Sequence, residues 1–243
     1  MTNKKETIII ILAAGKGTRM NSEIPKVLHK INNKSLIKHV VESAKSLNPK
    51  KIIIIVGFKK QLVMDNLEND SLCFVEQLEQ LGTGHAIKMC LPELKDFHGN
   101  ILILSGDVPL IKVETLSSFI NLHNKKKSLA SLITTDLENP KGYGRIIKKD
   151  NNFIKIKEHK DASENEKKIK EINSGIYIFN SNIIKNKIPL IKNDNVQKEF
   201  YLTDIFNFIE NNRISTYKTN DSKEISGINT IEQLKILENK LNK

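Results

Sequence analysis

The stretch IIIILAAGKGTRM, residues 8–20, decides the fold. Its first part, 8–12, is a continuous run of large apolar side chains, which is typical of a strand buried on both faces of a parallel sheet. Glycines at 15 and 17 then permit close approach of the backbone and positive φ angles. Consecutive backbone N–H groups in such a loop can surround phosphate oxygens. The stretch therefore predicts a buried strand that ends in an anion-binding loop.

Two more apolar runs, 51–56 and 100–104, repeat the pattern of the first strand, and segments with helical spacing separate them. Alternation of continuous apolar strands with helices indicates an α/β fold with a mainly parallel sheet covered on both faces. In such sheets ligands bind at the carboxyl ends of the strands. Three segments fall at such ends: Ala13–Arg19, Gly57 and Ser105–Pro109.

The second half of the chain has a different pattern. A turn at 150–152 lies between two short strands, which indicates a hairpin, and the charged stretch 163–170 is expected to be an exposed loop or a short helix. The segment 174–179 reads as a strand. Tyr201 is expected to begin a helix with Thr203 as its N-cap, and 231–241 to form a terminal helix. With no internal repeat or low-complexity linker, the 243 residues predict a single domain.

Composition excludes several classes of protein. The net charge is +11, but only three arginines are present and the lysines are spread along the chain, which disfavours nucleic-acid binding and still suits small anionic substrates. No apolar run is long enough for a membrane span, and the N-terminus lacks a signal-peptide pattern. Cys73 and Cys90 belong to no CxxC pair, which favours free thiols in a reducing compartment. We therefore expect a cytoplasmic protein.

Spaced motifs carry a more specific signal than the glycine loop. Beyond LAAGKGTRM and Pro25-Lys26, they are Gln77 with QLGTGHA at 80–86, GDVPL at 106–110, NPKGYGRI at 139–146, EHKDA at 158–162, EINSGI at 171–176, YLTD at 201–204 and GIN at 227–229. The first resembles the signature of nucleoside-diphosphate-sugar pyrophosphorylases. The ordered set, which covers about residues 8 to 238, resembles the N-acetylglucosamine-1-phosphate uridyltransferases.

The resemblance implies a Rossmann-like nucleotide-diphospho-sugar transferase fold, with a nucleotide-binding part at about 1–135 and a smaller sugar-binding lobe within 136–243. It also implies roles for individual residues. Arg19 and Lys26 would contact the triphosphate and stabilise the transition state, and Asp107 and Asn229 would hold Mg²⁺ through oxygen ligands. The remaining contacts implied are Leu12, Ala13, Ala14 and Gly15 around uridine and phosphate, Gln77, Gly82 and Thr83 at the uracil edge, Ser105 and Gly106 beside the metal ligand, and Gly144, Glu158 and Asn173 at N-acetylglucosamine.

The reaction implied by the resemblance is that of a UDP-N-acetylglucosamine diphosphorylase, which joins UMP from UTP to N-acetylglucosamine 1-phosphate and releases pyrophosphate. Its product is a precursor for the cell wall. The phosphate nucleophile is already ionised at neutral pH, so no side-chain base is needed and catalysis rests on positioning and charge neutralisation. Hard oxygen ligands suit Mg²⁺, which commonly takes one or two protein groups.

Two departures from the family pattern matter. Ser105 stands where the family often has a larger residue such as Tyr or Asn, which puts a substrate contact there in doubt. The bacterial bifunctional members of the family continue into a left-handed β-helix of hexapeptide repeats that carries acetyl transfer, and no such repeat is present in these 243 residues. We therefore expect no acetyltransferase activity from this chain. Trimers, which those members form mainly through the β-helix, are not implied, and the oligomeric state is left open.

Alternatives remain open at this stage. The substrate could be another sugar 1-phosphate or nucleotide, or the chain could be a silent nucleotide-sugar binding module or a basic nucleic-acid binder. Asp107 and Asn229 could be turn residues, and Glu158 and Asn173 could be strand residues without a ligand. The histidines at 85 and 159 are expected to be packed or surface residues and not catalytic ones.

Overall fold

The computed structural model describes residues 5–67 and 71–241, with no description of the side chains of residues 240 and 241. The strands are β1 Thr7–Leu12, β2 Lys30–Ile31, β3 Lys34–Ser35, β4 Lys51–Val56, β5 Leu72–Glu76, β6 Asn100–Ser105, β7 Ala130–Asp136, β8 Arg145–Lys149, β9 Asn152–Lys157, β10 Glu171–Asn180 and β11 Ile214–Lys218. The α-helices are α1 Leu36–Ser46, α2 Lys60–Asn66, α3 Thr83–Met89, α4 Val113–Lys125, α5 Glu164–Lys167, α6 Ser181–Lys187 and α7 Ile231–Leu241. Short 3-10 helices include η1 Thr18–Met20, η2 Lys26–Leu28 and η5 Leu202–Phe208.

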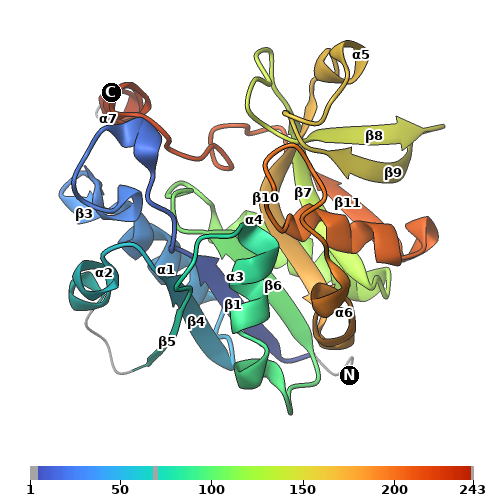
Figure 1. Cartoon of the computed structure of the whole chain (residues 1–243), viewed down its shortest axis with the longest axis horizontal. Coiled ribbons are helices and arrows are strands. Elements are labelled where there is room, and N and C mark those ends of the chain that lie inside the picture. The colour runs from blue at the N-terminus through green and yellow to red at the C-terminus, as the bar shows by residue number, and fades with distance from the viewer. Residues whose placement is uncertain (1–4, 68–70, 242–243) are drawn as a thin grey trace.

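One large mixed sheet organises the fold (Figure 1). Its strand order is β11-β7-β10-β6-β1-β4-β5, with β8 and β9 attached to it through β10. Strands β6, β1, β4 and β5 run parallel, and β10 is antiparallel to both of its neighbours in that order, β6 and β7. The α/β fold with a mainly parallel sheet is therefore confirmed, and the antiparallel strand is the addition that the sequence pattern did not give.

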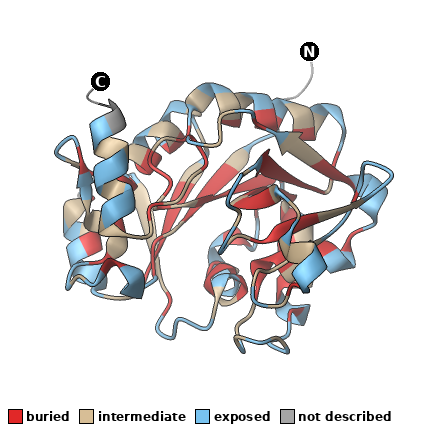
Figure 2. Ribbon diagram, turned by 90° about the horizontal axis from the view of Figure 1, so that it is seen from above, coloured by how far each residue is buried: buried red, intermediate tan, exposed pale blue. Residues whose placement is uncertain are grey.

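The isoleucine run of β1 shows why a continuous apolar strand is needed at this position. Successive side chains point to opposite faces of a sheet. Ile8 and Ile10 belong to one hydrophobic core, and Ile9 and Ile11 belong to another on the opposite face. All four are at most 3% exposed. Helices lie on both sides of the sheet, and its strands are the most deeply buried part of the molecule (Figure 2).

The sheet passes through both halves of the chain, because β6 from the first half pairs with β10 from the second. The hairpin of β8 and β9 projects from the sheet together with α5, at the upper right of Figure 1. The charged stretch around 163–170 contains α5, which begins with Ser163 and Glu166 bonded as a capping box. Assigning the nucleotide to about 1–135 and the sugar to 136–243 stays a prediction.

The expected helix start at Tyr201 needs a correction. The segment forms the 3-10 helix η5, Tyr201 occupies its N-cap position, and Thr203 lies inside it. Thr203 therefore does not cap a helix. Its hydroxyl donates instead to a carboxylate oxygen of Glu158, 2.8 Å away. The expected strand at 174–179 is also longer, since β10 begins at Glu171 and carries Asn173 within it.

Candidate active site

The carboxyl ends of β1, β4 and β6 bring the glycine loop and the Asp107 turn together. Leu12 at the end of β1 pairs with Ser105 of β6 on one side and with Ile55 of β4 on the other. The carbonyl of Leu12 accepts a hydrogen bond from the Gly106 amide at 2.9 Å, which continues the pairing beyond the strand. The loop after β1 is thus held against the turn that carries Asp107, as expected for a ligand site in a parallel sheet.

A cavity of about 340 Å³ opens at this edge of the sheet. Its walls contain most of the residues that were predicted to contact the nucleotide. They are Leu12, Ala13, Ala14, Gly15, Lys26, Gln77, Gly82, Thr83, Ser105 and Asp107, together with Val27, Gln80, Ala86 and Glu199. Gln80 and Glu199 were not among the predicted site residues. Gln80 belongs to the QLGTGHA motif, whereas Glu199 lies in none of the motifs.

Four side chains form a charged cluster beside this cavity. The Lys26 ammonium forms an ion pair with the Asp107 carboxylate and donates to Asn229 Oδ1 at 3.0 Å. The Arg19 guanidinium donates to the same Asn229 oxygen at 2.8 Å. The amide of Ile228 donates to the Asp107 carbonyl at 2.9 Å, which ties the GIN segment to the turn after β6. Residues far apart in the sequence therefore converge, as the resemblance implied.

The contacts of Lys26 also test whether these residues fit a Mg²⁺ ion. One nitrogen atom contacts both Asp107 Oδ2 and Asn229 Oδ1, so the two oxygens lie close enough to share a single cation. A carboxylate and an amide oxygen are the hard ligands that Mg²⁺ prefers, and the ion normally completes its shell with phosphate and water. The donor set fits the ion. A metal at this place would compete with the Lys26 ammonium for the same two oxygens.

The segment after β5 forms one wall of the cavity. Gln77 is 4% exposed, and its side-chain Nε2 donates to the Gly82 carbonyl at 3.0 Å. Gly82 adopts a φ of +110°, and a Cβ there would lie 2.6 Å from the Phe200 carbonyl oxygen, so this position requires glycine. The Leu202 amide donates to the Thr83 hydroxyl at 3.1 Å. The wall is therefore fixed to the chain around residues 200–202.

The residues assigned to the sugar form a second group. A Cβ placed on Gly144 would lie 3.4 Å from Glu158 Oε2 and 3.5 Å from the Asn173 Cβ, so the three positions adjoin one another. The Asn173 amide donates to the Gly144 carbonyl at 2.9 Å, and the Asn173 side chain donates to the Tyr177 hydroxyl at 2.6 Å. None of the three lines the 340 Å³ cavity. The structure thus confirms their proximity to one another and leaves their contact with a sugar as a prediction.

Tyr143 lies between the two groups and Thr203 contacts the second, and neither was among the predicted site residues. Tyr143 precedes Gly144 and packs close enough to Asp107 that this carboxylate, after burial, raises the pKa of the phenol, while a hydrogen bond with the backbone of Gly227 lowers it. Thr203 donates to Glu158. The YLTD and GYG motifs were visible in the sequence, but only the tertiary contacts indicate what their hydroxyl groups bind.

The electrostatics of Glu158 set it apart from the surface carboxylates. Burial raises its pKa above the ordinary value of 4.5, and the charges of Asp204, Asp161 and Glu199 raise it further, while the Thr203 hydrogen bond lowers it. The folded protein therefore holds a proton on Glu158 more tightly than the unfolded chain does. Its contribution to stability is fully present below about pH 4.5 and is lost as the pH rises through the raised pKa.

Glu158→Gln should consequently stabilise the fold at alkaline pH. A neutral amide keeps an oxygen for the Thr203 hydroxyl and removes the cost of a buried charge near other carboxylates. We expect the free energy of unfolding of the variant, relative to wild type, to increase between pH 4.5 and pH 8. Urea titrations at the two pH values measure this difference. The exposed Glu210→Gln is the control, and an equal trend in both variants would contradict the assignment to Glu158.

Most of the chain matches a known protein family. The model of a family described as nucleotidyl transferase matches residues 8–224. The chain belongs to the nucleotidyl transferase family. A nucleotidyltransferase must hold a nucleoside triphosphate and neutralise its charge. The assignment of the glycine loop, of Arg19 and Lys26 and of the Asp107 turn to that task stays a prediction.

Individual relatives of this nucleotidyltransferase confirm the resemblance. The bifunctional protein GlmU of Trichodesmium erythraeum is 44% identical over 237 residues, covering 93% of this chain and 50% of that protein. The bifunctional protein GlmU of Buchnera aphidicola subsp. Schizaphis graminum is 45% identical over 237 residues, covering 97% of this chain and 51% of that protein. The chain therefore spans about half the length of the curated relatives it matches.

Solved structures confirm the nucleotide-diphospho-sugar transferase fold. A UDP-glucose pyrophosphorylase complexed with UDP-glucose superposes with a TM-score of 0.76 at 19% identity, covering 98% of each chain. A putative glucose-1-phosphate thymidylyltransferase from Bacillus anthracis superposes with a TM-score of 0.74 at 20% identity, covering 97% of this chain and 94% of that one. Within the residues that the structure describes, no helix of the nucleotidyltransferase is both long and apolar enough to cross a membrane.

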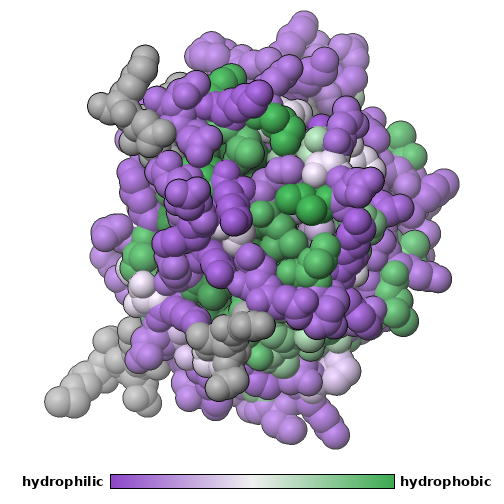
Figure 3. Space-filling view, turned by 90° about the vertical axis from the view of Figure 1, so that its left-hand side faces the viewer, coloured by the Kyte–Doolittle hydropathy of each residue, from purple (hydrophilic) through white to green (hydrophobic). Residues whose placement is uncertain are grey.

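One face of the outer surface is mostly hydrophilic. On the face at the left of Figure 1, hydrophilic side chains cover most of the surface and apolar ones gather near its centre (Figure 3). Cys73 and Cys90 are free thiols, as expected from the sequence.

Proposed function

We propose that the chain catalyses Mg²⁺-dependent transfer of UMP from UTP to N-acetylglucosamine 1-phosphate. The products are UDP-N-acetylglucosamine, a precursor for the cell wall, and pyrophosphate. The observation that carries the proposal is the convergence of Lys26, Arg19, Asp107 and Asn229 beside the glycine loop. The GlmU relatives at 44% and 45% identity support this choice of substrates.

The charged cluster fits the chemistry of this reaction. A phosphate oxygen of the sugar phosphate attacks the α-phosphorus of UTP, the bond from that phosphorus to the bridging oxygen of the β-phosphate breaks, and pyrophosphate leaves with both electrons. The nucleophile needs no base, since it is ionised at neutral pH. Lys26 and Arg19 would neutralise the charge that develops on the phosphoryl oxygens.

Asp107 and Asn229 are the residues that would hold Mg²⁺, and the ion would supply charge neutralisation and orientation of the phosphates when bound. The backbone amides of the loop at 13–17 would bind phosphate oxygens. The Gln77 and Gly82 wall would receive the base, and Gly144, Glu158 and Asn173 would receive the sugar. A cytoplasmic setting is part of the proposal, in keeping with the two free thiols.

A substrate panel tests the choice of substrates. Pyrophosphate release should be measured for UTP, CTP, ATP, GTP and dTTP, each with N-acetylglucosamine 1-phosphate, glucose 1-phosphate and glucosamine 1-phosphate. The proposal expects the highest kcat/KM for UTP with N-acetylglucosamine 1-phosphate. Faster turnover of another pair would mean that the pair we propose is not the substrate pair. Nucleotide binding without turnover of any pair would mean that the chain is a binding module and not an enzyme.

Thr203→Val gives a prediction for the sugar side of the site. Valine matches threonine in shape but lacks the hydroxyl that donates to Glu158 Oε1 at 2.8 Å. A hydrogen bond to a charged group contributes about 1.5–3 kcal/mol, so loss of this contact should raise the KM for the sugar phosphate by about tenfold. The KM for UTP should stay unchanged. Steady-state kinetics with each substrate varied in turn measure both values.

Thr203→Ser is the matched control, because serine keeps the hydroxyl group. Its KM for the sugar phosphate should stay close to that of wild type. Equal effects of the valine and serine variants would mean that packing of the methyl group, and not the bond to Glu158, determines the sugar site.

A further inference from the structure

The Gln77 side chain has a defined orientation on the wall of the cavity. Its backbone amide donates to the Val56 carbonyl at 2.8 Å, which fixes the start of the segment after β5. Its Nε2 donates to the Gly82 carbonyl at 3.0 Å and lies 3.1 Å from His85 Nδ1. Its Oε1 has no hydrogen-bond partner among the residues that the structure describes, so this oxygen is the atom of the amide left for a ligand.

The partners of Nε2 determine which way the amide faces. A carbonyl oxygen can only accept, so the group beside Gly82 must be the NH₂ of Gln77 and not its oxygen. One hydrogen of that NH₂ goes to Gly82, and the second is directed to His85 Nδ1. Nδ1 must then be unprotonated and accept, with the ring hydrogen on Nε2. The amide and the imidazole therefore specify each other's hydrogen-bonding roles.

We propose that His85 is a positioning residue for base selection, which acts by holding the Gln77 amide with Oε1 toward the base. This inference rests on the proposed function, since it explains how that same site prefers uracil. Uracil carries a hydrogen on N3, which pairs with an oxygen acceptor. Cytosine has an unprotonated N3, which an oxygen acceptor repels and an NH₂ donor would attract. The orientation of a single amide thus distinguishes the two pyrimidines.

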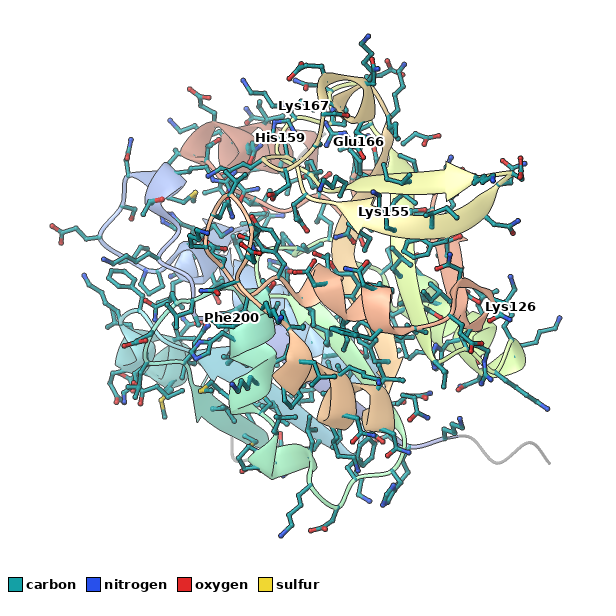
Figure 4. The ribbon with its side chains drawn as sticks, turned by 45° about the vertical axis from the view of Figure 1, so that its right-hand side comes forward. Lys126, Lys155, His159, Glu166, Lys167 and Phe200 are labelled. Atoms are coloured by element: carbon teal, nitrogen blue, oxygen red, sulfur yellow. The ribbon has the colours of Figure 1, made fainter. Side chains whose placement is uncertain are left out.

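The place of His85 in the fold suits an indirect role. It lies in the first turn of α3, is half-buried, and does not line the cavity. Its ring packs near the ring of Phe200, with centroids 6.2 Å apart, and Phe200 lies beside α3 in Figure 4.

Backbone bonds hold the two segments together at this point. The Gly84 amide donates to the Phe200 carbonyl at 2.7 Å, and the Phe200 amide donates to the Leu81 carbonyl at 2.8 Å. These bonds tie the backbone of α3 to that of Phe200, whose ring packs near the imidazole, and they fix the place of the His85 Nδ1 acceptor beside Gln77. A fixed acceptor is what an amide needs in order to keep one orientation when either orientation would fill the same space.

The test compares UTP with CTP in variants of His85. His85→Phe keeps an aromatic ring beside Phe200 but removes the acceptor, and His85→Asn retains an acceptor oxygen at the γ branch. The ratio of kcat/KM for UTP to that for CTP should fall by about tenfold in His85→Phe, the value of one hydrogen bond that favours a single orientation. It should stay near the wild-type ratio in His85→Asn. In a Gln77→Ala background, His85→Phe should change the ratio no further.

The ratio in His85→Phe decides whether the inference stands. General damage to the fold lowers kcat/KM for both nucleotides in the same proportion, so an unchanged ratio in His85→Phe would mean that His85 is only a packing residue. If His85→Phe does not fold, His85→Asn provides the test. A UTP-to-CTP ratio as low as that of Gln77→Ala would contradict the role of the acceptor. A ratio close to that of wild type would support it. A wild-type enzyme that prefers UTP, combined with an unchanged ratio in the variants, would leave the proposed function standing and remove only this inference. A wild-type enzyme without a preference for UTP would remove both.

Discussion

Asp107→Ala should lower turnover by about 1,000-fold, which corresponds to the several kcal/mol of transition-state stabilisation that a bound metal supplies. The variant removes the carboxylate that shares one cation position with the Asn229 oxygen. It also leaves the Lys26 ammonium without its ion-pair partner. Both changes disturb the charge balance at the triphosphate. Initial rates of pyrophosphate release at saturating Mg²⁺ measure the loss.

The fold should survive this substitution, because Asp107 lies in a turn beyond β6 and not in either hydrophobic core. Its backbone carbonyl keeps the bond from Ile228 whatever the side chain. Asp221→Ala is the matched control, since Asp221 forms a surface ion pair with Lys112 at 2.6 Å. Removing an exposed pair costs about 0–1 kcal/mol and should not affect turnover. Turnover of Asp107→Ala within tenfold of the control would disprove the metal-ligand assignment.

Lys26→Ala should produce two effects of opposite direction. Turnover should fall by about 100-fold, because one positive charge directed at the phosphoryl oxygens is lost. The affinity of the free enzyme for a divalent cation should rise by about tenfold, because the ammonium that donates to Asn229 and pairs with Asp107 no longer competes for their oxygens. Mn²⁺ titration followed by electron paramagnetic resonance, without nucleotide, measures the affinity directly.

Competition at the two oxygens distinguishes Lys26 from other lysines near the surface. Lys112→Ala removes an ammonium from the exposed pair with Asp221 and should change neither turnover nor Mn²⁺ affinity. An unchanged or weaker Mn²⁺ affinity in Lys26→Ala would mean that a metal does not share the position of the ammonium. In that case the turnover of Lys26→Ala would still measure the contribution of the Lys26 charge at the triphosphate.

The strands of the sheet were predictable because burial on both faces leaves a local signal. Ile8 to Ile11 alternate between two cores, so every position in the run must be apolar, whereas a strand with one face in water would expose half of them. The glycine loop was predictable only in part. Gly17 adopts a φ of +65° and lies against the Lys26 side chain, as its composition indicates, whereas Gly15 has neither a positive φ nor a close neighbour.

The contacts of the site were not predictable from spacing. Lys26 and Asn229 lie 203 residues apart, and no periodicity relates positions at that separation. Their roles came from the resemblance to a family, and their convergence from the structure. For Thr203 the local pattern predicted the wrong partner. Its position indicated an N-cap, in which the hydroxyl binds a nearby backbone amide. In the folded chain the hydroxyl instead donates to Glu158, which lies 45 residues away in the sequence.

His85 was expected to be a packed residue, and the structure agrees that it packs near Phe200. The hydrogen bond to Gln77 adds what a sequence pattern cannot express, namely the direction in which an amide faces. Antiparallel β10 is a similar case. Its apolar residues predict a strand, but its pairing with β6 and β7 depends on the path of the whole chain.

We expect this chain to transfer a uridylyl group at the site beside Asp107. The most direct measurement uses UTP labelled with ³²P at the α-phosphate, incubated with the protein, N-acetylglucosamine 1-phosphate and Mg²⁺, with the products separated by chromatography. The label should appear in UDP-N-acetylglucosamine, unlabelled pyrophosphate should form in equal amount, and chelation of the metal should stop both. Label that remains in UTP, or moves into any other product, would contradict this expectation.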